Sequence, residues 1–340
     1  MKLNAVILND TRGDNHFGCY RVMRLMEENL HGRDITITAT SLVRNRWDRD
    51  KSFLKHLSEA DLIIINGEGT LHHGASAGER LLKVTEHPAR RNTPVALINA
   101  IYQENPSEWR RYLDKIDLIC VRDSWSAKEI KDQTGRDVAF VPDLSLSGRK
   151  SPDNGRNERD MLLIGDSVSR GVTRTLLDIA ASGKDAYIIP ITKAIKSSKP
   201  HFSPAPRLLR EIYIRAHAEF FKMRHPNSIF NTTEEGFIET IRRGYLHVTG
   251  RFHSVCFCLF THTPFLAVES NSWKIRALLE DTGMGGRRLV SADDLKDHAL
   301  DSHSNAFDAH EIAAIDAALE LCRTKSAELF DAISRLPSET

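Results

Sequence analysis

The most informative group of polar residues is Gly-Arg-Phe-His-Ser at residues 250–254, which separates an apolar run from a helical pattern. Arg251 is suited to bind a phosphate or a carboxylate, because its guanidinium can donate two parallel hydrogen bonds. His253 could donate a proton to a leaving group or to a developing anion. With Ser254 beside them, these residues predict a site that binds an anion and transfers a proton.

A second helix start follows at residues 269–274, where Ser272 is a capping residue type and Lys274 brings a cation one turn into the expected helix. Backbone N–H groups at the start of a helix attract anions. Two such helix starts, together with Arg251 and Lys274, therefore predict a phosphate pocket. Two capped helices with surface cations are the alternative interpretation.

Glu68 is the most unusual carboxylate in the first half, because it lies between Gly67 and Gly69 directly after an apolar run. A carboxylate there is poorly placed for core packing and well placed to act as a general acid or base, or to accept hydrogen bonds from a sugar hydroxyl. Gly13 lies in an earlier loop at residues 9–18, where glycine permits a tight turn or a close approach of the backbone. That loop is equally compatible with a simple strand-to-helix turn.

Two more charged residues, Arg122 and Asp143, follow apolar runs. Arg122 beside a helix start suits an anion, whereas an Arg–Asp pair with a helix cap is the alternative. Asp143 could face a cleft, and a cap or turn role is equally open. Residues 48–50, Asp-Arg-Asp, have the spacing of a metal motif of some glycosyltransferases, but they open a charged helix instead of following an apolar strand. We expect neither a metal site nor a cofactor.

These residues depend on elements that the apolar runs define. Runs of four to six apolar residues without polar alternation predict strands buried on both faces of a mostly parallel sheet. The expected strands are 3–8, 35–39, 62–65, 95–98, 118–121, 138–141, 161–164, 186–190, 246–249 and 265–268. The expected helices are 17–30, 50–57, 78–85, 107–113, 125–132, 207–221, 234–243, 252–260, 273–280 and about 310–334. Ligands bind outside the carboxyl ends of parallel strands, where the candidate residues lie.

The alternation predicts an α/β protein with two Rossmann-like parallel-sheet domains facing a cleft. The polar, glycine-bearing segment 145–160 is the expected linker and hinge. The predicted domains cover residues 1–147 and 148–308, and a long amphipathic helix fills most of 309–340.

Composition excludes several classes of function. The chain has 47 Lys and Arg against 46 Asp and Glu, and a net charge of +1 argues against a general nucleic-acid binder. No apolar run approaches the ~20 residues of a membrane helix, and the first ten residues do not resemble a signal peptide. The five cysteines form no CxxC pair, which argues against a disulfide framework. We expect a cytoplasmic protein without a membrane span, able to associate peripherally with the inner membrane face.

Taken together, these motifs resemble the polysaccharide pyruvyl transferase family. The specific parts are the Gly-Arg-Phe-His-Ser stretch, the run at residues 263–268 and the later Lys274, while the glycine-bearing first loop, Gly-Glu-Gly at 67–69 and Arg-Asp-Ser at 122–124 follow in the expected order. Arg251 and His253 match the Arg-x-His of the family's active site. One feature departs from the family: its third-strand loop is commonly a run of glycines, which Glu68 interrupts here.

The resemblance implies a two-domain GT-B-like transferase that moves the enolpyruvyl group of phosphoenolpyruvate onto sugar hydroxyls as a ketal and releases phosphate. The first domain would take the acceptor, a saccharide that is free or lipid-linked, and the second would take the donor. Arg251, Arg122 and Lys274 would hold the phosphate and carboxylate of the donor. His253 would protonate the leaving phosphate or the enol carbon, and Glu68 would orient or deprotonate the acceptor hydroxyl.

An alternative uses the same scaffold as a GT-B glycosyltransferase with a nucleotide-activated sugar, for example a CMP-Kdo-like donor. Arg251 and His253 would then hold the donor phosphate, and Glu68 and Asp143 would be the acid/base and nucleophile of a double displacement. A third interpretation, a saccharide-binding protein without catalysis, is disfavoured because so many reactive side chains coincide at strand ends.

Overall fold

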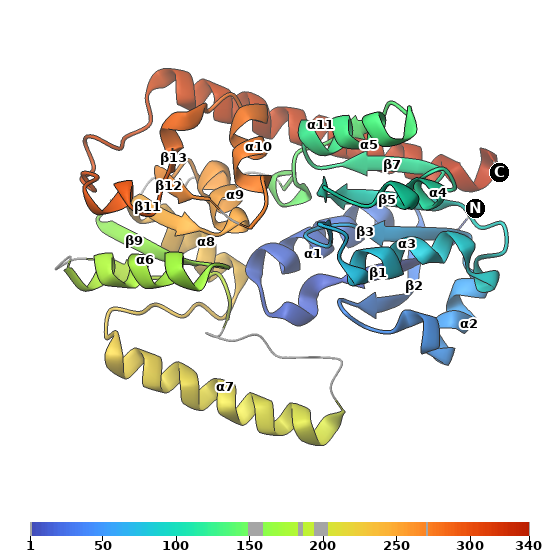
Figure 1. Cartoon of the computed structure of the whole chain (residues 1–340), viewed down its shortest axis with the longest axis horizontal. Helices are drawn as coiled ribbons and strands as arrows, with labels where there is room; N and C mark the ends of the chain where they lie inside the picture. Colours follow the sequence, from blue (N-terminus) through green and yellow to red (C-terminus); the bar gives the residue numbers. More distant parts are fainter. Residues whose placement is uncertain (1, 149–158, 183–185, 194–202, 270, 340) are drawn as a thin grey trace. The chain divides into compact units, whose positions relative to one another are not determined.

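The computed structural model describes residues 2–148, 159–182, 186–193, 203–269 and 271–339 (Figure 1). Contacts within the chain divide it into two units. Unit 1 comprises residues 1–12, 22–147 and 321–340, and unit 2 comprises residues 13–21 and 148–320. The change from one unit to the other at 147/148 falls inside the predicted linker 145–160, of which residues 149–158 lie outside the described part of the chain.

Unit 1 is built on one parallel sheet. Its strands, in spatial order, are β2 (Ile35–Leu42), β1 (Leu3–Asp10), β3 (Leu62–Asn66), β5 (Val95–Ala100), β7 (Leu118–Val121) and β8 (Ala139–Phe140). A short parallel pair, β4 (Leu71–His72) and β6 (Tyr102–Gln103), lies apart from it. Its helices are α2 (Lys51–Glu59), α3 (Ser76–Leu82), α4 (Arg110–Leu113), α5 (Ser124–Thr134) and most of α1 (Phe17–His31).

The core of unit 1 explains why these runs form central strands. Side chains of β1 and β3 are buried whichever face of the sheet they point to, as Ile7 and Leu8 or Ile63 and Ile64 show. A strand of a parallel sheet that is covered on both faces needs such continuous apolar sequence.

Unit 2 repeats the pattern with a smaller parallel sheet. Its strands, in spatial order, are β10 (Ala186–Ile188), β9 (Met161–Ser167), β11 (Gly244–Gly250), β12 (Phe265–Val268) and β13 (Leu289–Val290). The helices are α6 (Arg170–Ser182), α7 (Pro204–Arg224), α8 (Glu234–Arg242), α9 (Phe252–Thr261) and α10 (Lys274–Asp281). The first part of α11 (Ala309–Glu339), up to residue 320, also belongs to unit 2, and unit 1 resumes at Leu321.

Each sheet has a topological switch point beside its first strand. In unit 1, β1 lies between β2 and β3, so the chain runs in opposite directions across the sheet on either side of it. In unit 2, β9 lies between β10 and β11 in the same way. Ligands of open α/β sheets bind outside the carboxyl ends of the two strands that flank such a reversal. These ends are Asp10 and Asn66 in unit 1, and Ser167 and Gly250 in unit 2.

The predicted strands and helices are present, with ends shifted by a few residues. The two-residue strands β4, β6 and β13 were not predicted, because so short a run has no periodicity. Helix α6 was also missed. Within the described residues, no helix combines the length and the apolar character needed to cross a membrane.

Candidate functional site

Arg251 lies where β11 ends and α9 begins, as the sequence predicted. It is the N-cap residue of α9, and its backbone N–H donates to the Thr249 hydroxyl at 3.1 Å. The guanidinium forms an ion pair with the carboxylate of Asp166, near the end of β9. Arg251 and Asp166 thus occupy the two strand ends at the switch point of unit 2.

The ion pair leaves hydrogen-bonding capacity unused. Within the described part of the chain, Nε of Arg251 and Oδ1 of Asp166 are both buried and make no hydrogen bond. A buried N–H group without an acceptor is costly, and a bound anion would satisfy it. Asp166 was not among the predicted site residues, although its place after the first strand of the second domain is a recognisable signal.

His253 lies in the first turn of α9 and is 6% exposed. Its ring lies against the backbone at the start of α1: a Cβ atom on Gly18 would be 2.1 Å from Cγ of His253. The absence of a side chain at residue 18 therefore lets the imidazole occupy this position. Ser254, the next residue of α9, is buried as well.

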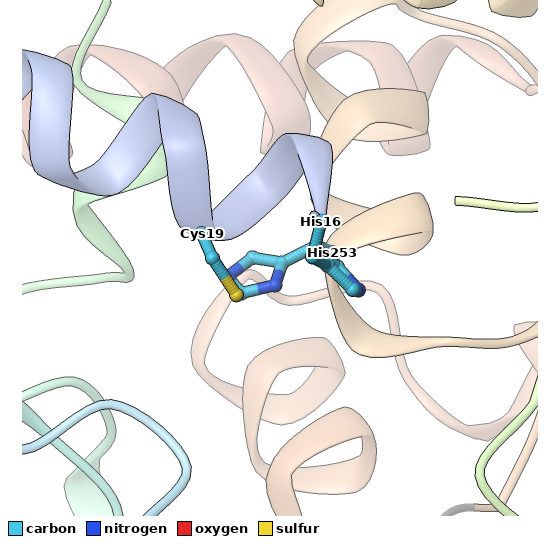
Figure 2. Close-up of side chains that lie close together, drawn as sticks. All are labelled: His16, Cys19 and His253. Atoms are coloured by element: carbon cyan, nitrogen blue, oxygen red, sulfur yellow. The ribbon is translucent and has the colours of Figure 1, made fainter. Parts of the chain in front are cut away.

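Two residues that the sequence analysis did not single out lie beside His253. Figure 2 shows His16 and Cys19, from the start of α1, gathered with His253. The rings of His16 and His253 meet edge to face with centroids 5.1 Å apart. One ligand atom from each of the three residues lies within 4.8 Å of the others. The His-x-x-Cys spacing at a helix start could have indicated the first two, because residues three apart share a helix face.

The loop before α1 holds His16 in place. His16 pairs with Thr192 in an isolated antiparallel bridge, and the Phe17 N–H donates to the Ile191 carbonyl at 3.3 Å. These contacts all belong to unit 2. Gly13, which the sequence analysis proposed for backbone approach to a ligand, lies in the short 3-10 turn Thr11–Asp14 ahead of this loop.

Lys274 is positioned differently from the sequence expectation. Helix α10 begins at Lys274, with Trp273 as its N-cap residue, so the cation is at the first helical position and not one turn in. Its ammonium group donates to the side chain of Asn271 at 3.1 Å. Ser272 is half-buried just before the helix and is not its cap.

Glu68 lies at the switch point of unit 1. It is 3% exposed and follows β3, where it accepts a hydrogen bond from the Thr11 hydroxyl at 2.5 Å and a longer one from the Asn66 amide at 3.3 Å. Thr11 follows β1 directly, so the two residues join the strand ends that flank the reversal.

The two glycines beside Glu68 differ in what they permit. A Cβ on Gly67 would lie 2.2 Å from the Cβ of Ala100, so the close approach of β5 requires glycine at that position. A Cβ on Gly69 would meet no heavy atom within 4 Å. Gly67 therefore serves the packing of the sheet, and Gly69 faces open space.

Arg122, directly after β7, forms an ion pair with Asp143, in the segment that follows β8. The distance from Nη1 to Oδ2 is 3.3 Å, and both side chains are almost fully buried. Asp143 also accepts a hydrogen bond from the Ser145 N–H, and Asp123 caps α5. An Arg–Asp ion pair and helix caps, which were the alternative interpretations of these residues in the sequence, are therefore present in the structure. Strand β5 separates β7 from β3, so this pair is not at the switch point with Glu68.

Several solved structures share the fold. The chain matches a putative UDP-N-acetylglucosamine 2-epimerase from Listeria monocytogenes with a TM-score of 0.53 at 11% identity, over 100% of this chain and 98% of the other. An α,α-trehalose-phosphate synthase (UDP-forming) from Burkholderia vietnamiensis gives 0.54 at 11% identity, over 100% and 99%. Anabaena HepE, in complex with UDP and glucose, gives 0.51 at 11% identity, over 99% and 98%. No curated protein matches the sequence.

These likenesses and the two switch-point sheets define an α/β protein of the GT-B type, which confirms the predicted fold class. The sequence model of the family described as polysaccharide pyruvyl transferase matches residues 20–272, well over half of the chain. The chain therefore belongs to the polysaccharide pyruvyl transferase family, and it is a transferase, as the sequence predicted.

Proposed function

We propose that this transferase moves pyruvate from phosphoenolpyruvate to a sugar hydroxyl, as a ketal, in the synthesis or modification of a cell-surface polysaccharide. The observation that supports this most directly is that Arg251 and His253 both lie at the start of α9, beside the switch point of unit 2. The buried Nε of Arg251 makes no hydrogen bond in the described residues, and a phosphate or carboxylate oxygen would satisfy it.

In this proposal the donor is held by cations and activated by an acid. Arg251 and Lys274, at the starts of α9 and α10, bind the phosphate and carboxylate of phosphoenolpyruvate. His253 gives a proton to the methylene carbon of the enol or to the departing phosphate. Protonation of the methylene carbon makes C2 an electrophile. A sugar hydroxyl adds to C2, and a second hydroxyl replaces the phosphate to complete the ketal.

The residues of unit 1 take the acceptor in this proposal. Glu68 accepts the proton of the attacking hydroxyl, and its own hydrogen bond from Thr11 orients the carboxylate. Arg122 is a second candidate for binding an anionic group of the donor. To do so, its guanidinium would have to give up the buried ion pair with Asp143.

The test combines ligand stabilisation with two variants. Phosphoenolpyruvate is expected to raise the melting temperature and, with a saccharide acceptor, to yield free phosphate. Arg251→Ala and His253→Ala should each abolish transfer and leave the fold intact, because they remove contacts made at the reacting centre. Arg243→Ala and His262→Ala are matched controls in the same unit, each at a partly exposed ion pair, and should keep transfer. Normal rates in either site variant would show that the site is elsewhere.

A second candidate function has one specific observation in its favour. A cavity of about 440 Å³ opens at the ends of β12 and β13 in unit 2, and Glu269 and Arg276 line it. A carboxylate after a strand of this kind can accept hydrogen bonds from the hydroxyls of a ribose. A nucleotide-activated sugar, such as a CMP-Kdo-like donor, would then be the substrate, with Glu68 and Asp143 as catalytic carboxylates.

The same assay separates the two candidates. If nucleotide sugars stabilise the protein, phosphoenolpyruvate does not, and Glu269→Gln removes the stabilisation, the glycosyltransferase replaces the pyruvyl transferase. If phosphoenolpyruvate alone stabilises the protein and Glu269→Gln has no effect on it, the first proposal stands.

The location is also part of the proposal. All five cysteines are buried thiols in the structure, in keeping with a reducing, cytoplasmic compartment. A lipid-linked saccharide acceptor would be met at the inner face of the membrane, and cell fractionation is the direct test.

A further inference from the structure

Helix α7 (Pro204–Arg224), drawn in yellow in Figure 1, exposes a row of large apolar side chains. These side chains are between 48% and 77% exposed: Leu208, Leu209, Ile212, Tyr213, Phe220 and Met223. At 3.6 residues per turn their directions fall within an arc of about 140° on one side of the helix. An apolar row of this size on a single helix face marks an interaction surface more often than chance exposure.

The row is not the face by which α7 packs on its own domain. Ile214, which is 3% exposed, and Phe221, which packs against the core of unit 2, lie on the opposite side of the helix. The helix therefore already has its core-facing side, and folding gives no reason for a second apolar face.

Cationic side chains flank the apolar row. Helix α7 carries five basic residues and two acidic ones, an excess of three positive charges in a chain whose net charge is +1. Helical geometry places Arg215 and Lys222 along one border of the row and Arg224 along the other. All three are exposed. Apolar side chains between cations are the composition of a helix that lies in a lipid interface with anionic headgroups.

We propose that α7 docks unit 2 on an anionic membrane surface, with the helix axis in the plane of the interface. The apolar row enters the boundary between headgroups and acyl chains, and the flanking cations contact phosphate groups. This inference does not rest on the proposed function, because it is argued from the side chains of α7 alone. If the acceptor is a lipid-linked saccharide, docking would bring the enzyme to its substrate.

The test uses the full chain and vesicles of two compositions, phosphatidylcholine alone and an equal mixture with phosphatidylglycerol. The protein should sediment with the mixed vesicles and much less with the neutral ones, and added salt should weaken the binding. The double variant Leu209→Ser/Ile212→Ser should bind at least about ten-fold more weakly, because it removes two exposed aliphatic side chains from the middle of the row. Arg215→Gln/Lys222→Gln, which removes the two cations along one border of the row, should weaken binding to the mixed vesicles alone.

The matched control is Ile312→Ser, which removes an aliphatic side chain that is 42% exposed on α11. It should bind vesicles like the wild type. Equal sedimentation with both vesicle types, or unchanged binding of the double variants, would overturn the proposal. If instead Leu209→Ser/Ile212→Ser converts a dimer to a monomer and vesicle binding is absent throughout, α7 is a subunit interface and the proposal is wrong.

An independent observation concerns the His16–Cys19–His253 cluster of unit 2. Two imidazoles and one thiol form a donor set that suits Zn²⁺ or Co²⁺. In a tetrahedral zinc site, donor atoms of these types are about 3.5 Å apart. The atoms here all lie within 4.8 Å of one another, so modest side-chain rotations would bring them to a common ion.

We infer that these three residues bind a thiophilic divalent cation and leave its fourth position to water or an anion. The sequence gives no local signal for this site, because His253 is more than 230 positions away from the other two residues. One consequence rests on the proposed function: an ion on His253 occupies the imidazole that would donate the proton, and transfer should be inhibited.

Cobalt gives a readout that is independent of activity. Addition of Co²⁺ to the purified protein should produce the near-ultraviolet charge-transfer band of a cobalt–thiolate bond, saturating at one equivalent. Cys19→Ser should abolish the band, and His16→Ala should weaken cobalt binding at least about ten-fold. Cys256→Ser, which alters a different buried thiol, on α9, should keep the band.

The absence of the band, or its persistence in Cys19→Ser, would overturn the metal site. If Cys19→Ser fails to fold, judged by circular dichroism, His16→Ala decides the question alone. A site that binds cobalt without inhibiting transfer would show that His253 is not the proton donor, which contradicts the proposed function and leaves the metal site standing.

Discussion

At the scale of single residues, anion binding in unit 2 depends on the residue that orients the guanidinium of Arg251. A guanidinium on a flexible side chain binds an anion well only when its direction is fixed beforehand. Asp166 supplies this constraint from the neighbouring strand, since its carboxylate pairs with Nη2 of Arg251. We therefore regard Asp166 as a positioning residue, which acts on the donor through Arg251.

Asp166→Asn removes the charge and keeps the shape of the side chain. The KM for the donor should rise about ten-fold while kcat changes less, because Arg251 remains but is no longer oriented. Steady-state kinetics with varied donor concentration gives both values. Asp160→Asn, at the exposed pair with Arg243, is the control and should change neither. A fall in kcat at constant KM would mean that Asp166 acts on the reaction itself.

Glu68 is the acid/base candidate that both proposed functions share. Glu68→Gln keeps the hydrogen bond from Thr11 but removes the basicity, so transfer should slow by at least about 10²-fold with donor binding retained. Rates and donor-induced thermal shifts measure the two effects. Glu104→Gln, which alters an exposed carboxylate of unit 1, should behave as wild type. Full activity of Glu68→Gln would reduce Glu68 to a loop residue with a structural hydrogen bond.

At the scale of elements, the start of α1 and the start of α9 are fitted to each other at Gly18. Gly18→Ala would place a methyl group 2.1 Å from Cγ of His253. Either the helix or the imidazole must move, and we expect a loss of about 1–3 kcal/mol in the free energy of unfolding together with reduced transfer. Denaturant unfolding and activity assays measure these. Gly69→Ala, where a methyl group meets nothing within 4 Å, should be tolerated in stability.

Strand β11 contains a fully buried histidine, His247, which makes the free energy of unfolding depend on pH. Burial lowers the pKa of His247 to about 4, so the folded state keeps it neutral where the unfolded state takes up a proton. The contribution of the neutral imidazole to the free energy of unfolding is fully present above about pH 6.5. It is lost as the pH falls towards 4, and this loss is at most about 3 kcal/mol. Urea unfolding across this range should show a shallower pH dependence in His247→Gln than in wild type. The exposed His31→Gln should keep the wild-type slope.

The elements also show how far the sequence could lead. Continuous apolar runs such as residues 62–65 identify central parallel strands, because few other structures need burial on both faces. Reactive residues at strand ends, such as Arg251, follow from the same pattern. Contacts between distant segments have no such local signal: nothing near His253 indicates His16, and the ion pair of Asp166 with Arg251 follows only when β9 and β11 are known to be neighbours.

At the scale of the whole molecule, the last turns of α11 belong to the first unit. From Leu321 onward the helix contributes buried side chains to unit 1, and Sγ of Cys322 donates to the Pro142 carbonyl at 3.3 Å. The sequence predicted the helix but not the unit to which its end belongs. Amphipathic spacing predicts that a helix has an apolar face, but it does not predict which domain that face packs against.

Phe330 is the natural probe of this arrangement, since it is fully buried. Phe330→Ala should cost about 3–5 kcal/mol in unfolding free energy, and the loss should fall on unit 1. Hydrogen exchange followed by mass spectrometry can locate it: faster exchange is expected in β1 and β3, and little change in β9 and β11. Ile312→Ser, on the exposed side of the same helix, should be nearly neutral. Uniform loss of protection in both units would contradict the assignment of the helix end to unit 1.

The division of the chain has a consequence for its synthesis. Unit 2 has the residues assigned to it once Glu320 has been translated, whereas unit 1, whose first strand precedes unit 2 in the chain, still lacks residues 321–340. On the ribosome, the domain that is started first is therefore the one that is finished last. Its apolar sheet is synthesised early, but its packing is complete only after residues 321–340 have been made. Chaperones should therefore contact nascent chains chiefly through unit 1.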